Sequence, residues 1–481
     1  MLMFGSCRDL TELNINPNNV SEAHPQLLLT TIEWGAFQLE GSGPLYPSRM
    51  VVQTDGENNG QYYNWDRSDF GSYFRLRDVT KMIEEAERVE SDAYLALGKF
   101  FRAHYFYGLA LTFGDIPYTE ALQGESNSIY APLYDEQKNV FIGILKELSE
   151  ANDLLDGNTE TIFGDIIFSG STEKWRKLVN SYRLKVLMTL SKKEGEAGLN
   201  LKGDFSAIVS GQPLMESIAD NGQLVFINQS GSQYTNFNNS GWGSAFYMDS
   251  TFIKRLQDRK DPRLFIYSDR TKNAKEAGLA EDDFSAYEGG NPVAPYANGN
   301  EKAIVGNISK PNLRYTIDPV NEPGVLLGYS ELQLILSEAA VRGWIAGSAA
   351  SYYEKGVRAS FEFYNKEAEN YSAYVTDAAA TSYLAEPLVD FAMAGTPEEK
   401  IELIITQMYL QSFMQSGWTM YFNNLRTGYP AFLHRSPAET PPTRWIYPID
   451  EYQQNEVNVK AAVTRQYGGN DAIREVPWWL K

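Results

Sequence analysis

Three segments of the chain combine aromatic rings with amide and glycine residues. Their candidate ligand-binding residues are Tyr62, Tyr63, Asn64 and Trp65 in the first segment, Tyr234, Asn236, Phe237 and Trp242 in the second, and Tyr296 in the third. Flat rings supply large contact areas at little entropic cost, and amides adapt their hydrogen bonds. This combination suits the C–H faces and hydroxyls of a sugar, and it suits an extended peptide almost as well. The alternative is that the rings hold long loops onto the body, which is the better prediction for any single ring.

No catalytic motif accompanies these segments. The three histidines, His24, His104 and His434, are too far apart in sequence for an H-E-x-x-H pair. A G-x-S-x-G elbow, a Walker loop and a G-x-G-x-x-G fingerprint are also missing. We therefore predict a protein that is not an enzyme. A glycoside hydrolase remains the alternative, because 62 acidic residues always offer some carboxylate pairs.

The sequence predicts no cofactor. The single cysteine cannot form an intramolecular disulfide or a zinc site that needs two cysteines. Asp165 and the pair Asp282 and Asp283 leave a structural calcium ion open, although no D-x-[DN]-x-[DN]-G loop is present.

The chain is acidic and rich in tyrosine. Its 481 residues carry a formal net charge of −20, which disfavours binding to phosphate backbones, so no nucleic-acid partner is expected. Thirty tyrosines exceed what a core needs, since the hydroxyl of each requires a polar partner. No run of 18 apolar residues occurs, so no membrane-crossing helix is expected.

The elements that position these residues are mainly helices. Apolar spacing predicts helices near residues 26–40, 73–90, 92–113, 135–155, 172–193, 246–257, 328–345, 349–365 and 398–425. Tyr94-x-x-Leu97-Gly98 and the pair of helices around Tyr329 and Tyr353 resemble degenerate tetratricopeptide units. The predicted fold is mainly α, a helical body with tetratricopeptide-like helix pairs and loop-rich excursions that form a binding face.

We expect two parts along the chain. Residues 1–20 read as a lipobox-like N-terminus and polar tether, and residues 21–481 as one domain with loop-rich insertions at about 41–72, 204–245 and 268–325. Long loops without regular structure are uncommon unless they are functional or disordered, and disordered segments are poor in aromatics. Gly5 and Ser6 before Cys7 look like the end of a lipoprotein signal, although six residues are too few for a complete signal peptide. We expect Cys7 to be lipidated, and either a misplaced start codon or a trimmed sequence would account for the missing part of the signal.

Several motifs, in order along almost the whole chain, resemble the SusD/RagB family. They are FFRAHYFYGLALTFGDIPYTEAL from Phe100, Lys174-Trp175-Arg176-Lys177, Asp261-Pro262-Arg263-Leu264, LLGYSELQLILSEAAVRGWIAG from Leu326, Gln415-Ser416-Gly417-Trp418, Leu425-Arg426-Thr427-Gly428-Tyr429-Pro430, Tyr447-Pro448 and Val476-Pro477-Trp478-Trp479. These segments are apolar helices and their caps, so we expect them to serve the fold.

The resemblance implies a surface-exposed, lipid-anchored outer-membrane protein that is not an enzyme. It implies a SusC-like TonB-dependent transporter as partner, onto which the protein passes nutrient oligosaccharides, or peptides in some members. Contact with the membrane is expected through the lipid on Cys7 only. The family's binding loops vary with the ligand, so the resemblance carries over no ligand residue.

Overall fold

The computed structural model describes residues 24–243, 245–415, 417–436 and 438–481. Cys7 and the expected tether at residues 1–20 therefore lie outside the described residues. In the part that is described, none of the helices combines the length and the apolar composition needed to cross a bilayer.

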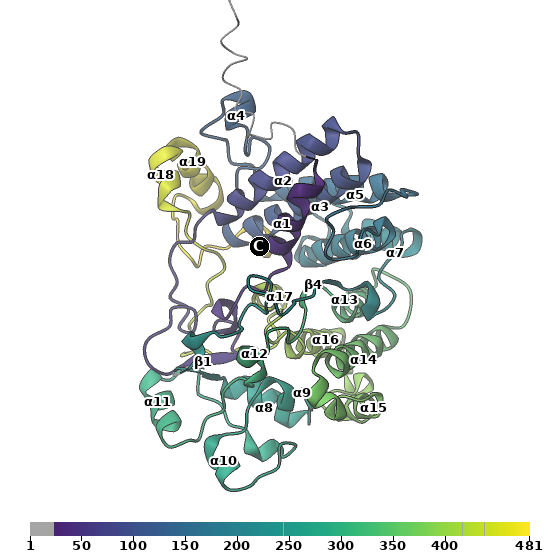
Figure 1. Ribbon diagram of the computed structural model, residues 1–481. Coiled ribbons are helices and arrows are strands. Elements are labelled where there is room, and N and C mark those ends of the chain that lie inside the picture. The colour runs from purple at the N-terminus through teal and green to yellow at the C-terminus, as the bar shows by residue number, and fades with distance from the viewer. Residues whose placement is uncertain (1–23, 244, 416, 437) are drawn as a thin grey trace, which may run out of the picture.

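Helices dominate the architecture (Figure 1). Those of the first half are α1 (Gln26–Phe37), α2 (Gly71–Arg88), α3 (Asp92–Phe113), α4 (Gly124–Asn127), α5 (Gln137–Leu155), α6 (Thr172–Thr189) and α7 (Leu201–Gly211). Those of the second half are α8 (Ser250–Asp258), α9 (Arg263–Tyr267), α10 (Lys272–Glu276), α11 (Tyr296–Ile304), α12 (Arg314–Ile317), α13 (Tyr329–Val341), α14 (Ala349–Glu367), α15 (Asp377–Leu384), α16 (Pro397–Leu410), α17 (Thr419–Thr427), α18 (Ile449–Gln454) and α19 (Glu456–Tyr467).

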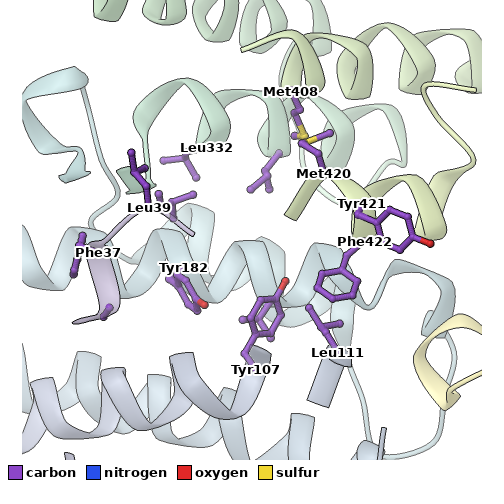
Figure 2. Close-up of a cluster of buried hydrophobic side chains, with 14 of the residues drawn as sticks. Phe37, Leu39, Tyr107, Leu111, Tyr182, Leu332, Met408, Met420, Tyr421 and Phe422 are labelled. Carbon is purple, nitrogen blue, oxygen red and sulfur yellow. The ribbon is translucent and has the colours of Figure 1, made fainter. Parts of the chain in front are cut away.

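The long helices pack as neighbouring pairs. Extensive contacts join α2 to α3, α3 to α5 and α5 to α6 in the first half, and α13 to α14 and α16 in the second. Most helices of the second half lie below those of the first in Figure 1, with α17 and β4 (Gly324–Leu327) between them, whereas α18 and α19 lie at the upper left beside the first half. Figure 2 shows Tyr107, Tyr182 and Phe422 close together where helices of the two halves face each other. This arrangement confirms the mainly helical prediction.

Helix α3 shows why the sequence folds this way. The side-chain oxygen of Ser91 accepts the backbone N–H of Tyr94 and caps the first turn. Residues all round the helix are buried, as expected for a central helix. The helix ends at Gly114, whose φ of 98° suits glycine, and a Cβ there would lie 2.4 Å from the hydroxyl of Tyr467.

Asp115, directly after this glycine, ties α3 to two distant segments. Its carboxylate accepts the backbone N–H of Gln137 at 2.8 Å and forms an ion pair with Arg465 on α19. The hydroxyl of Tyr447 donates to its carbonyl at 2.6 Å. The signature segment therefore serves the fold, as predicted.

Two expected helices differ in the structure. Residues Phe246–Met248 form strand β3 and only Ser250–Asp258 is helical, because the strand pairs with β1 (Val51–Gln53) and Asp249 caps the helix that follows. The long helix expected over 398–425 is divided into α16 and α17. The chain leaves helical geometry between them, with positive φ angles at Met414 and Gly417.

Candidate ligand-binding face

A short two-stranded ribbon brings the first two predicted loops together. Strands β1 and β3 are antiparallel, with Val52 opposite Tyr247, and the N–H of Thr54 donates to the carbonyl of Ala245 at 3.1 Å. The first loop leaves the end of β1 at Thr54, and the second loop enters β3 after Ala245. The pairing therefore fixes the start of one loop beside the end of the other.

The third loop joins at Gln61 and Tyr62. The side-chain amide of Gln61 donates to the backbone carbonyl of Pro292 at 3.1 Å. The hydroxyl of Tyr62 donates to the backbone carbonyl of Ala294 at 2.9 Å. Tyr296, two residues further on, begins α11 and is 37% exposed, whereas Tyr62 is only 9% exposed. We call the segments 54–66, 291–300 and 431–436 the loop face. It lies at the left of Figure 1, around β1 and α11.

The segment 431–436 of the loop face was not anticipated from the sequence. Arg435 donates to the carbonyl of Tyr62 at 2.9 Å, and its guanidinium lies 5.6 Å from the centre of that ring. Arg435 also pairs with Glu439 at 2.7 Å. Residues 431–440 contain one phenylalanine, no tyrosine or tryptophan, and no periodic pattern. The only signal in the sequence that could have pointed to a binding segment is Arg435 directly after His434.

Tyr63 and Trp65 hold the first loop to the core. Tyr63 is fully buried, donates to the carbonyl of Pro47 at 3.0 Å and lies under the Arg49 guanidinium at 4.1 Å. Trp65 stacks on Trp445 with ring centres 4.9 Å apart. Tyr63 has a φ of 54°, a costly conformation that only strong surrounding contacts maintain. Asn64 lies between the two rings in sequence and is exposed.

The residues of the second loop divide between two places. Tyr234 is 2% exposed, lies edge-on to Phe226 and packs beside Tyr315 of α12. Asn236 is buried with it, and Phe237 is half-buried against the same core. Trp242 instead stacks on Phe246 of β3, with ring centres 4.7 Å apart.

The structure thus sorts the nine predicted residues by exposure. Asn64 and Tyr296 are exposed, Trp65 and Phe237 are half-buried, and the buried ones are Tyr62, Tyr63, Tyr234, Asn236 and Trp242. A ring without an accessible face offers no stacking surface to a ligand, so the buried rings act as loop anchors in this conformation. Ligand contact stays a prediction. We now restrict it to the exposed residues Asn64 and Tyr296, together with the small accessible part of the neighbouring Tyr62.

Metal ligands are not gathered on this face. Across the ranges that the structure describes, no group of three or more histidine, cysteine, aspartate or glutamate side chains is arranged to hold a metal ion. Asp165, one of the predicted calcium candidates, accepts the N–H groups of Ile167, Phe168 and Gly170 and the indole N–H of Trp175. Its carboxylate organises a loop.

Comparison with known proteins places the chain in a class. A family model described as SusD-like, starch-binding associating with outer membrane, matches residues 17–448. The chain belongs to this SusD-like family. Among curated proteins, none matches the chain significantly.

Solved structures agree with this membership. A SusD homologue from Bacteroides fragilis NCTC 9343 is 51% identical with a TM-score of 0.92, covering 96% of this chain and 100% of its own. A second SusD homologue of the same strain is 34% identical with a TM-score of 0.88, at 95% and 100% coverage. A chitin-binding protein is 26% identical with a TM-score of 0.75, at 95% and 99% coverage.

Proposed function

We propose that the protein binds nutrient oligosaccharides on the loop face and passes them to a SusC-like TonB-dependent transporter. The observation that supports this most is the convergence of three loops around Tyr62 and Tyr296 in a member of a starch-binding family. Tyr296 offers a partly accessible ring, while Asn64, Asn298 and Asn300 offer exposed amides. Rings and amides together match the C–H faces and hydroxyls of a sugar.

The proposal includes an outer-membrane, cell-surface location and a lipid on Cys7. Acyl chains contribute about 0.8 kcal/mol for each buried methylene, and several chains together give a stable anchor. A tether of this kind keeps the binding domain near the transporter and raises its effective concentration there. Replacement of Cys7 by alanine in a full-length precursor tests the anchor: release from membranes is expected, and persistent attachment would contradict it.

Binding is tested with one purified preparation on a glycan array and on a peptide library. An oligosaccharide hit supports the proposal, and a peptide hit without a sugar hit would replace the ligand class. Prolonged incubation with a bound oligosaccharide should leave its length unchanged, because binding without catalysis is proposed. Shortening of the glycan would restore the glycoside hydrolase alternative.

The loop face is tested with Tyr296→Ala. We expect the affinity for the oligosaccharide to fall by about tenfold, as for a contact residue whose ring is lost. The melting temperature should stay near that of the wild type, because Tyr296 is partly exposed. Tyr130→Ala is the matched control, since Tyr130 is 79% exposed and its segment lies near α4, far from α11 (Figure 1). Equal affinities of the two variants would remove Tyr296 from the site.

A further inference from the structure

A cavity lined by both apolar and polar side chains lies in the middle of the molecule. Its volume is about 250 Å³, and its walls come from both halves of the chain. Tyr105, Tyr107 and Leu111 of α3 and Tyr182 of α6 line one side, and Phe422 of α17 lines the other. Figure 2 shows four of these, Tyr107, Leu111, Tyr182 and Phe422, gathered in the space between the helices. Known small-molecule sites are somewhat larger, so this cavity suits a ligand the size of one sugar ring.

Glycine at position 108 keeps the cavity open. Gly108 is in the interior of α3, yet it has an accessible surface, and a Cβ built there would meet no atom within 4 Å. Glycine destabilises a helix interior by about 1 kcal/mol relative to alanine. The sequence therefore carries a small residue on the cavity wall although neither packing nor helix stability requires it.

Glu40 projects into this space without an ionic partner. Its side chain keeps an accessible surface that faces the cavity, and its deep position raises the pKa of its carboxyl to about 7 by desolvation, against the lowering effects of the Trp418 hydrogen bond and the Lys185 charge. The backbone N–H of Trp418 is its hydrogen-bond donor. A Cβ at Gly417 would lie 2.5 Å from the Glu40 carboxyl carbon, so the turn is shaped to admit this side chain. No lysine or arginine in the described residues forms a salt bridge with Glu40.

Of the charged side chains that line the cavity, Lys185 and Glu331 pair with each other and Glu40 forms no salt bridge, while the cationic Arg75 lies against the cavity wall beside Gly35. Lys185 is matched by Glu331, with Nζ and Oε1 3.0 Å apart. Burial lowers the pKa of His104 to about 4, so its ring is neutral at physiological pH. A carboxylate that lines a cavity without a salt bridge favours a ligand that carries a hydrogen-bonding cation.

We propose that this cavity binds a small molecule that carries an ammonium group on a polar body the size of one sugar ring. The ammonium would pair with Glu40, and the rings of Tyr105 and Trp418 would contact its C–H groups. This site adjoins the loop face but is lined by none of its residues: the Trp418 side chain lines the cavity and also contacts Trp65, with ring centres 5.7 Å apart. The exposed Arg75 lies against Gly35 at the cavity wall, which marks an entrance between α1 and α2.

Three related sugars test the proposal by isothermal titration calorimetry at about pH 7, where glucosamine is largely an ammonium ion and a pKa of about 7 leaves the Glu40 carboxyl partly ionised. Glucosamine carries the ammonium, glucose replaces it with a hydroxyl, and N-acetylglucosamine neutralises it. Saturable binding of glucosamine at least about tenfold tighter than that of the other two is expected, since hydrogen bonds to charged groups are the strong ones. Equal affinities for all three, or no saturable binding of glucosamine, would overturn the proposal.

Two variants locate the binding. Glu40→Gln keeps the shape and removes the charge, and it should weaken glucosamine binding by about tenfold. Gly108→Met should fill the cavity and abolish binding without lowering the melting temperature, because methionine is the better helix former. Glu402→Gln, an exposed change of the same charge on α16, is the control and should bind like the wild type. Retained glucosamine affinity in either cavity variant would refute the site.

A loop-face variant keeps the two sites distinguishable. Tyr296→Ala should leave glucosamine affinity unchanged if the ligand lies in the cavity. A parallel loss of glucosamine and oligosaccharide binding in Tyr296→Ala would assign both to the loop face and overturn the cavity proposal.

Discussion

Glu33 offers a test of how the fold tolerates a buried acid. Its side chain on α1 has no exposed surface and lies beside Asp165. One carboxyl oxygen accepts the N–H of Ile166 at 2.7 Å, and the other has no hydrogen-bond partner. Burial first, and then the Asp165 charge, raise the Glu33 pKa from 4.5 to about 10. The carboxyl is therefore protonated in the folded protein at neutral pH.

The sign of the pH dependence follows from proton binding. Between pH 4.5 and about 10 the folded state holds a proton on Glu33 that the unfolded state has released, so stability falls as pH rises. At pH 7 the window covers about 2.5 pH units, at about 1.4 kcal/mol each, and the cost is about 3 kcal/mol. Glu33→Gln removes this cost, because a glutamine is neutral at every pH and can still accept from Ile166.

Urea unfolding of wild type and Glu33→Gln at several pH values measures the difference. We expect the variant to be more stable by about 1 kcal/mol at about pH 5 and by about 3 kcal/mol at about pH 7, with a larger gain at about pH 9. Glu402→Gln, at an exposed position, should show no such trend. A difference that does not change with pH, or a variant less stable than wild type at neutral pH, would refute a protonated Glu33.

Three further predictions concern single residues. Gly114→Ala should lower the free energy of unfolding by at least about 2 kcal/mol in urea titrations, because its Cβ would approach Tyr467 in a backbone conformation that favours glycine; wild-type stability would contradict the close approach. Arg263→Leu should cost about 3–5 kcal/mol by the same assay, since it leaves the Asp261 carboxylate, 2.6 Å away and fully buried, without its partner; a loss below about 1 kcal/mol would argue against the pair. Trp65→Ala should cost about 3–5 kcal/mol through lost packing on Trp445, visible as a clear fall in melting temperature; an unchanged melting temperature would argue against a role for Trp65 in holding the loop and would restore it as a candidate ligand contact.

The helical framework was largely predictable, because it depends on local patterns. The predicted helix over 92–113 matches α3 at both ends, since Ser91 caps its start and Gly114 permits its end. The helix expected over 398–425 failed because its apolar spacing continues beyond Leu410, whereas the backbone turns over residues 411–415. Gly417, which has a positive φ and no side chain there, leaves room for the Glu40 carboxyl, and that contact comes from a segment hundreds of residues earlier.

The candidate site was predicted at the level of segments only. All three predicted loops contribute to it or support it, but five of the nine named residues are buried. Tyr63 and Tyr296 have the same side chain in similar surroundings of asparagine and glycine. Their exposure differs because Arg49 and Pro47 cover the first, whereas the second begins a helix at the surface.

The sequence by itself determined the family, the helical body and the acidic, tyrosine-rich character of the chain. These follow from local spacing and from motifs that hold helices together, such as Asp115 after Gly114. The tertiary structure alone decided which aromatic rings are accessible, that Arg435 joins Tyr62, and that Glu40 faces a cavity beside Lys185 and His104. Accessibility and charge balance depend on side chains far apart in sequence, and only packing brings those together.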